Sequence, residues 1–410
     1  MTGARDPRDA RVVIVGGGLG GFTVAKELRD RGHRGPIAVV DPAGLPYDRP
    51  PLSKGYLSGE RTLDDLRFES ADWYAERGID VVEDAATALD LDDLAVVVAG
   101  GDRLPADRIV LATGGRARPL PLDGADDPRV HVLRTSDDAD RLRAAIGEGT
   151  RLAIVGGGLI GAEAASTAAS LGARVTLIEP ADPPLVPAVG PELARRLHDM
   201  HEEREVRVRT ALPASLELAD DAVRIELTDG DPIEADALLV GIGIIPNTGL
   251  AESAGLDVDN GVLVDERQRT ADPRVLAVGD IARLRFADGA LARRHEHWDN
   301  AIASGVRAAA AIVDDPEPAP SAGWFWSDRY GCHVEGVGEM HVDGTTVLRH
   351  DRDGRPTAAF RLGADGRMLG AAAIDGGLTV RAARRIIDRG AVVDPEALAD
   401  PAVDLKRLAR

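Results

Sequence analysis

One short pattern occurs twice in this chain and limits its fold more than any other feature. The segments "RVVIVGGGLGG", from residue 11, and "RLAIVGGGLIG", from residue 151, each join a short apolar run to a glycine turn and a helical sequence. A second apolar run follows each helix and ends in an acid, "IAVVD" at Asp41 and "RVTLIE" at Glu179. Strand, helix and strand in this order predict two βαβ units. We therefore expect an α/β protein with two Rossmann-like domains.

The glycines in both turns have the spacing of the dinucleotide fingerprint. The first glycine permits a tight turn, the second lets a pyrophosphate approach the backbone, and the third lets helix and strand pack closely. Free N–H groups at the helix N-terminus hold phosphate, and the terminal acid accepts hydrogen bonds from ribose hydroxyls. The two sets are Gly16, Gly18 and Gly21, and Gly156, Gly158 and Gly161.

A single GxGxxG is weak evidence, because glycine turns are common. Here the whole order of strand, glycines, helix, strand and acid is repeated, which disfavours two generic βαβ units that bind nothing. Two fingerprints predict two dinucleotides, and FAD with a nicotinamide nucleotide is the natural pair.

The chain has 410 residues, more than one ordinary core accommodates. The Pro-rich segment at 314–323 indicates a domain boundary. We expect an FAD-binding domain in two parts, 1–115 and 244–320, a NAD-binding domain at 116–243, and a small α+β domain at 321–410. Within them we expect a hairpin at 228–231, helices at 63–78, 191–205, 300–313 and 378–390, and strands at "TTVLRH" and "TAAFRL".

Charge and cysteine content exclude several classes of protein. The net charge is 49 − 69 = −20, which disfavours binding to nucleic acid or an anionic membrane. No apolar run approaches membrane-spanning length, and the start has no signal-peptide core, so we expect a soluble, cytoplasmic protein. Cys332 is the only cysteine, so no internal disulfide or cysteine metal cluster can form. We expect it to be a small buried hydrophobe.

Several phrases carry a family resemblance. "RPPLSKGYLSG", "LATGGRARPLP", "VLRTSDDA", "GGGLIGAE", "GIGIIPN", "TADPRVLAVGD", "EHWDNA" and "WFWSD" occur in this order across nearly the whole chain. With them the chain resembles the FAD-dependent NAD(P)H:ferredoxin reductases of bacterial oxygenase systems, the putidaredoxin reductase type. The resemblance implies a glutathione-reductase-like pair of dinucleotide domains without the redox disulfide of the wider superfamily.

The resemblance implies three catalytic residues. Lys54 would stand beside the flavin near N5, where a fixed cation stabilises the negative charge that arriving hydride creates. Glu163, on the first turn of the second fingerprint helix, would point toward the nicotinamide and pair with Lys54. The alternative for Glu163 is a glutamate that complements the helix dipole. Trp326 would lie at the flavin edge where ferredoxin docks.

The resemblance also implies a set of cofactor-binding residues. Asp41 would hold the adenosine ribose of FAD, Thr87 would lie near its adenine, and Arg134 would neutralise its phosphate. Asp280 would bind the ribityl hydroxyls, and Trp298 would present backbone to the flavin ring. The full predicted set is Gly16, Gly18, Gly20, Gly21, Asp41, Arg49, Lys54, Thr87, Ala112, Thr113, Gly114, Arg134, Gly156, Gly158, Ile160, Gly161, Glu163, Glu179, Gly243, Gly279, Asp280, Glu296, His297 and Trp298.

Two histidine groups do not predict a metal site. His198 and His201 share one side of a helical segment, but that segment is rich in Arg and Glu, which is typical of a solvated face. His295 and His297 belong to "EHWDNA", which the resemblance makes a flavin-flanking segment.

The leading functional hypothesis is an electron-transfer enzyme. NADH would give hydride to FAD, and an iron–sulfur ferredoxin would take electrons singly to a cytochrome P-450-class monooxygenase or a Rieske dioxygenase. A flavin is needed because hydride carries two electrons and the cluster accepts one. Ferredoxin would dock near Trp326, framed by the cations Arg307, Arg381, Arg384 and Arg385. The oligomeric state is left open.

Two alternatives were weighed. Disulfide reductases and cysteine-dependent NADH oxidases carry a redox cysteine soon after the first fingerprint, and here that region has none. A non-enzymatic NADH-binding flavoprotein that acts through partner contacts, similar to apoptosis-inducing factor, stays open. We expect NADH to be preferred over NADPH, because Glu179 would repel a 2′-phosphate and residues 180–192 contain no arginine.

Overall fold

The computed structural model describes residues 6–408, which form two compact units. The first unit comprises the chain up to Arg49 with Leu63–Arg116 and Ile244–Ala319. The second comprises Pro50–Thr62, Ala117–Gly243 and the chain from Pro320 onward. Each unit contains one of the two fingerprints, so each has its own parallel sheet.

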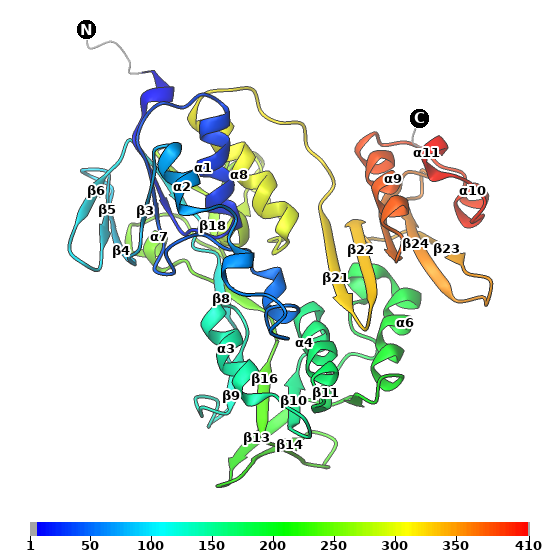
Figure 1. Cartoon of the computed structure of the whole chain (residues 1–410). Coiled ribbons are helices and arrows are strands. Elements are labelled where there is room, and N and C mark those ends of the chain that lie inside the picture. Colours follow the sequence, from blue (N-terminus) through cyan, green and yellow to red (C-terminus); the bar gives the residue numbers. More distant parts are fainter. Residues whose placement is uncertain (1–5, 409–410) are drawn as a thin grey trace. The chain divides into compact units, whose positions relative to one another are not determined.

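A five-stranded parallel sheet organises the first unit, in the order β19-β7-β1-β2-β3. Every residue of β1 is buried, as expected of a strand covered on both faces. Val12 and Ile14 share a core with α1 and α8, whereas Val13 and Val15 face a small antiparallel sheet of β4, β5 and β6. Figure 1 shows α1 beside α8. The bounds are β1 (Val12–Val15), α1 (Leu19–Asp30), β2 (Ile37–Val40), β3 (Ile79–Val82), β4 (Ala86–Asp90), β5 (Ala95–Val98), β6 (Arg103–Pro105), β7 (Arg108–Leu111), β19 (Val275–Ala277) and α8 (Trp298–Ile312).

Shorter elements complete the first unit. The helix expected at 63–78 is wrong in extent, because Ser70 is the extended N-cap of a shorter helix and its side chain accepts from the Trp73 N–H. The shorter elements are η1 (Pro7–Asp9), η3 (Asp64–Leu66), α2 (Ala71–Glu76), β17 (Ile244–Pro246), α7 (Gly249–Ser253), β18 (Val262–Val264), η4 (Gly279–Ile281) and β20 (Ala282–Leu284).

The second unit repeats the plan, with a parallel sheet in the order β12-β11-β10-β16-β9. One face packs against α3 and α4, and the other against the antiparallel strands β13, β14 and β15. The hairpin expected at 228–231 is confirmed, since β14 and β15 flank it. The bounds are η2 (Pro50–Ser53), β9 (Val130–Val132), α3 (Ser136–Ala145), β10 (Arg151–Val155), α4 (Leu159–Ser170), β11 (Arg174–Ile178), α5 (Val186–Val189), α6 (Pro191–Glu202), β12 (Arg207–Arg209), β13 (Pro213–Leu218), β14 (Val223–Leu227), β15 (Ile233–Ala235) and β16 (Ala237–Val240); β8 spans Gly115–Ala117.

The chain from Trp324 onward forms a five-stranded antiparallel sheet in the order β21-β22-β25-β24-β23. Both faces of β25 are apolar: Ala371 and Ala373 pack toward α9, whereas Ala372 and Ile374 pack toward α6. Because α6 packs against this sheet, the sheet is part of the second unit. The bounds are β21 (Trp324–Arg329), β22 (Cys332–Gly338), β23 (Thr345–His350), β24 (Pro356–Leu362), β25 (Met368–Ile374), α9 (Gly377–Asp388), α10 (Pro395–Ala399) and α11 (Leu405–Leu408).

Among residues 6–408, no helix is both long enough and apolar enough to cross a bilayer.

Candidate functional site

The first fingerprint turn is shaped by close backbone approaches. Gly16 has φ +110°, and a Cβ there would collide with the carbonyl oxygen of Ala112. A Cβ on Gly21 would fall on the carbonyl oxygen of Gly16. Gly20 lies against Val278 and Gly279, because a Cβ on it would lie 3.3 Å from the Val278 side chain and 3.7 Å from the Cα of Gly279. The fold of the first unit therefore brings together the fingerprint, the "LATGG" segment and the "AVGD" segment.

The second fingerprint turn has the same geometry. Gly156 has φ +106°, and a Cβ there would lie 2.5 Å from the carbonyl oxygen of Gly241. A Cβ on Gly161 would fall on the carbonyl oxygen of Gly156. The first and third glycines of both turns are therefore required by the packing of the protein itself.

The middle glycines are different, and they indicate a ligand. A Cβ built on Gly18 or Gly158 would meet no protein atom within 4 Å. Both residues are extended N-caps without a side-chain cap, so the N-termini of α1 and α4 are open. Exposed N–H groups at a helix N-terminus are an anion site when a ligand phosphate can approach. The residues present thus fit a dinucleotide pyrophosphate at each turn.

Asp41 joins the end of β2 to the first turn. Its Oδ2 accepts a hydrogen bond from the Gly17 N–H at 2.6 Å, and its Oδ1 accepts one from the Ala43 N–H at 2.8 Å. Each carboxylate oxygen keeps a lone pair for a ribose hydroxyl. Asp41 therefore stabilises the turn and remains able to bind a sugar.

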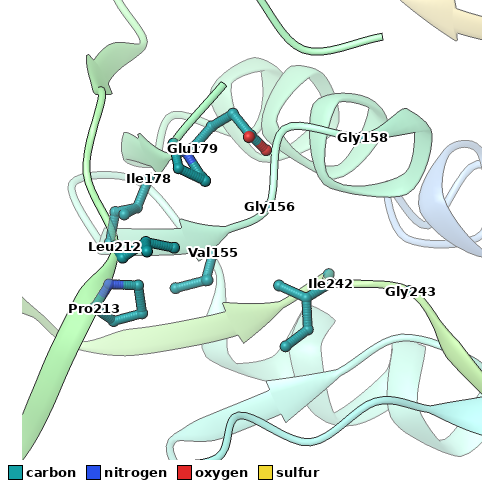
Figure 2. A pocket seen from close by; sticks show the side chains of 11 residues that line it. Val155, Gly156, Gly158, Ile178, Glu179, Leu212, Pro213, Ile242 and Gly243 are labelled. Carbon is teal, nitrogen blue, oxygen red and sulfur yellow. The ribbon is translucent and has the colours of Figure 1, made fainter. Parts of the chain in front are cut away.

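Glu179 repeats this arrangement at the end of β11. Its Oε2 accepts from the Gly157 N–H at 2.7 Å, and its Oε1 accepts from the Ala181 N–H at 2.8 Å. The side chain lines a cavity of about 340 Å³ with apolar walls that include Ile242 and Leu212. Figure 2 shows the carboxylate turned toward the glycine loop. An apolar cavity with one carboxylate at the turn suits a nucleoside.

Glu163 is the most enclosed charge of the predicted site. It lies on α4 and is only 3% exposed. Its Oε2 accepts from the Ser53 hydroxyl at 2.5 Å, and its Oε1 accepts from the Ser327 hydroxyl at 2.7 Å and from the Asp328 N–H at 3.2 Å. Its Oε1 also lies 3.1 Å from Lys54 Nζ. A buried carboxylate needs such partners to compensate its lost hydration.

Lys54 is held between two acids and beside an aromatic ring. Besides Glu163, its Nζ lies 3.5 Å from Asp328 Oδ2 and 5.8 Å from the centroid of the Trp326 ring. Trp326 stacks on Trp324. The second unit therefore brings the three predicted catalytic residues into one cluster, although they come from the turn after η2, from α4 and from β21.

Sequence reasoning missed the supporting residues of this cluster. Thr167 donates its hydroxyl to the Ser53 carbonyl oxygen at 2.8 Å, and this bond ties η2 to α4. Arg329 is almost completely buried and donates to the Ser327 hydroxyl at 3.2 Å. Burial lowers the pKa of Arg329, and the negative charge of Glu163 opposes that shift. "WSDR" carried a signal for Ser327 and Arg329, since three polar residues follow an aromatic run.

The other predicted residues of the first unit lie apart from the glycine turn in the sequence. The indole of Trp298 donates to Asp48 at 3.1 Å, which connects "EHWDNA" to the segment before the two prolines. Arg49 lies over the Tyr47 ring. Thr87 is exposed on β4 and donates to the Val97 carbonyl oxygen.

Further predicted positions fall on loops and helix starts. Glu296 pairs with Arg294 at 2.7 Å. His297 is the N-cap of α8, and burial lowers its pKa. Arg134 precedes α3, and its N–H donates to Asp138. Ile160 is exposed on the first turn of α4, and its apolar side chain does not by itself identify a ligand.

Two expectations about side chains were wrong. His198 and His201 face inward on α6, and the ring of His201 bonds to the Tyr330 hydroxyl at 2.7 Å. Burial lowers the pKa of His201 to about 3. The Arg and Glu residues cover only the outer side of that helix. Cys332 is partly exposed on β22 rather than buried. Among the described residues no group of His, Cys, Asp or Glu could hold a metal ion.

The cations expected to frame a docking surface have different surroundings. Arg381 and Arg385 are exposed on α9, and Arg384, between them, donates to the Ser321 hydroxyl at 3.0 Å. Arg307 is largely buried on α8, and burial lowers its pKa. An arginine that sequence reasoning missed, Arg195 on α6, pairs with Asp182 at 2.6 Å, close to the end of β11.

Comparison with known proteins identifies the family. Residues 10–305 match the family described as pyridine nucleotide-disulphide oxidoreductase, and residues 324–409 match the domain described as reductase C-terminal. The chain belongs to this family of oxidoreductases.

Full-length relatives are more specific. The chain is 39% identical to the ferredoxin–NAD(+) reductase component of the anthranilate 1,2-dioxygenase system of Burkholderia cepacia, over 96% of this chain and 98% of that protein. It is 34% identical to putidaredoxin reductase CamA of Pseudomonas putida, over 97% and 96%. It also resembles the crystal structure of the covalent putidaredoxin reductase–putidaredoxin complex, with a TM-score of 0.91, 34% identity and 98% coverage of both chains.

Proposed function

We propose that this protein is an FAD-dependent NADH:ferredoxin reductase of a bacterial oxygenase system. NADH is the hydride donor, and the electrons pass singly to an iron–sulfur ferredoxin that serves a cytochrome P-450-class monooxygenase or a Rieske dioxygenase. The observation that carries the proposal is the pair of matching dinucleotide turns in a chain with one cysteine, which lies on β22. Full-length similarity to reductases of dioxygenase systems supports it.

In this proposal a bound flavin supplies the change from two-electron to one-electron chemistry. The first turn, with Gly18 and Asp41, holds FAD, and the second, with Gly158 and Glu179, holds the nicotinamide nucleotide. Lys54 provides a fixed positive charge in an enclosed site. Glu163 holds Lys54 in place and is itself fixed by two serine hydroxyls.

Two alternatives are weaker. A disulfide reductase needs two cysteines, or one cysteine that reacts with an external thiol. This chain has only Cys332, which is partly exposed on β22 and does not follow the first fingerprint. A non-enzymatic flavoprotein would be compatible with both dinucleotide turns but not with full-length similarity to named reductases. The domain limits expected from the sequence and a cytoplasmic location stay predictions, and cell fractionation tests the latter.

The function is tested directly with a panel of ferredoxins from the same genome. We expect the purified holoenzyme to use NADH to reduce at least one of them, followed by the visible absorbance of its cluster. Ferricyanide is the control acceptor, because it reports NADH oxidation without a protein partner. Activity with ferricyanide but with no member of the panel would favour the non-enzymatic alternative.

We expect kcat/KM for NADH to exceed that for NADPH. The Glu179 carboxylate can accept from a 2′-hydroxyl but repels a 2′-phosphate. The nearby cation Arg195 is paired with Asp182. Steady-state assays with both nucleotides check this, and Glu179→Ala with Pro184→Arg should narrow the preference. An NADPH value equal to or above that for NADH would show that Glu179 does not face the ribose.

A further inference from the structure

A line of ionisable side chains in the second unit leads from the buried cluster to its surface. Glu163 Oε1 lies 3.1 Å from Lys54 Nζ, which lies 3.5 Å from Asp328 Oδ2. The other oxygen of that carboxylate, Oδ1, lies 2.5 Å from Nδ1 of His333. The exposed fraction of the side chain rises along the line: it is 3% for Glu163, 21% for Lys54, 42% for Asp328 and 43% for His333. The line therefore connects the enclosed site to solvent through adjoining proton-binding groups.

His333 is surrounded mainly by acids. Asp328 faces it from β21, and Glu335 on its own strand has Oε2 at 3.8 Å from Nε2. Asp375, after β25, accepts from the His333 backbone N–H. Arg381 on α9 is the cation near Glu335, since both contact the Cβ position of Gly377. The His333 ring therefore lies between the carboxylate of Asp328 and solvent.

The reaction needs such an outlet. With the proposed function, the balance is NADH + 2 ferredoxin(oxidised) → NAD⁺ + 2 ferredoxin(reduced) + H⁺. The hydride brings one proton and two electrons, and the ferredoxins take only the electrons. One proton per NADH must therefore pass from an enclosed site to solvent.

We propose that Asp328 and His333 form the outlet for this proton. Lys54 gives one proton to Asp328 and is reprotonated from the reacting side, while Glu163 keeps its ammonium group in place. In the tautomer of His333 that carries its proton on Nε2, Asp328 passes the proton to Nδ1, and the ring then releases the Nε2 proton to water. The 3.5 Å step between Lys54 and Asp328 is the widest, and a bridging water or a small rotation of the lysine completes it. Every side chain regains its starting protonation state after exchange of the ring protons with water.

A second histidine in the same unit provides a matched control. His341 has nearly the same exposure, 42%, and a carboxylate partner, Glu339, at 3.8 Å. Within the part of the chain that the structure describes, no hydrogen bond or ion pair joins His341 or Glu339 to the cluster around Glu163. Replacement of His341 therefore reproduces the loss of an exposed imidazole without interrupting the line.

The first test uses the holoenzyme with NADH and ferricyanide, which takes one electron and no proton, in weakly buffered solution. His333→Ala should slow turnover by about tenfold to a hundredfold. A positioned proton-transfer group typically contributes about a hundredfold or more, and the expected loss is no larger than that lower limit. Added imidazole should restore the rate. Asp328→Asn should also be slow but should not respond to imidazole, and His341→Ala should match the wild type. A pH-indicator dye in stopped flow should show proton release lagging behind electron transfer in His333→Ala.

Equal rates for His333→Ala and His341→Ala, or a loss that imidazole does not restore, would overturn the outlet. If His333→Ala folds poorly in thermal melts, His333→Gln replaces it. A second readout needs no turnover: the ¹⁵N resonances of the His333 ring in the oxidised holoenzyme should move in Lys54→Met, whereas those of His341 should not. Unchanged His333 resonances in Lys54→Met would show that Asp328 does not couple Lys54 to His333. The inference rests on the proposed function, but the two fail separately, because the ferredoxin panel tests the function and the histidine pair tests the outlet.

Discussion

Replacing Lys54 with methionine should slow reduction of the bound flavin by NADH by about 10²- to 10³-fold, the usual cost of removing one preorganised charge from a reacting centre. Methionine keeps the length of the side chain and removes its charge. FAD affinity should change much less, because the glycine turn, Asp41 and the open helix N-terminus lie elsewhere in the sequence. Stopped-flow absorbance measures the reduction rate, and titration of apoprotein measures the affinity.

Lys26→Met is the control for this variant. Lys26 is partly exposed on α1, and its ion pair with Asp30, four residues away, is an interaction of small energy. The Lys26→Met variant should leave the rate of flavin reduction and the FAD affinity unchanged. A wild-type reduction rate in Lys54→Met would remove Lys54 from the mechanism.

Gly161→Ala and Gly158→Ala should affect different properties, stability and nucleotide affinity, although the two glycines are three residues apart. In Gly161→Ala the new methyl group collides with the Gly156 carbonyl oxygen, which cannot move without opening the turn. We expect a loss of about 3 kcal/mol or more in the free energy of unfolding, seen as a fall of roughly 10 °C in Tm. Calorimetry of the holoenzyme measures this change.

Gly158→Ala should keep its Tm, because its extended backbone suits alanine and its Cβ points into open space. Its affinity for NAD⁺ should fall by about tenfold, which corresponds to about 1.4 kcal/mol, because the methyl group occupies the approach of the pyrophosphate. Titration with NAD⁺ followed by flavin absorbance gives the affinity. A stable Gly161→Ala, or a Gly158→Ala with unaltered affinity, would contradict the assignment of the two glycines.

The parts that could be predicted from the sequence are those encoded locally. Both βαβ units, the hairpin at 228–231 and the amphipathic helix α9 follow from the spacing of apolar residues and glycines within about 30 residues. The resemblance of "RPPLSK" and "GGGLIGAE" to one family also placed Lys54 beside Glu163, and the structure has that pair. Their assigned roles stay predictions.

What could not be predicted depends on contacts between distant segments. Ser53 and Ser327 both donate to Glu163, yet they are 110 and 164 residues from it in the chain. The inward orientation of His201 is fixed by a bond to Tyr330, which is 129 residues later in the chain. β21 was noticed only as an aromatic motif, because its alternation of buried residues is clear only once β22 pairs with it.

The double use of Glu179 limits how the nucleotide preference can be redesigned. Both of its oxygens already accept backbone N–H groups, so Glu179→Ala, which removes the repulsion of a 2′-phosphate, also releases two amides of the turn. In the proposed nucleotide site, selectivity and rigidity of the loop are therefore coupled through one side chain. A change of coenzyme is better sought with Glu179→Gln, whose carbonyl oxygen can still accept one of the two N–H groups. Release of Arg195 from both Asp182 and Asp199 would then supply the cation.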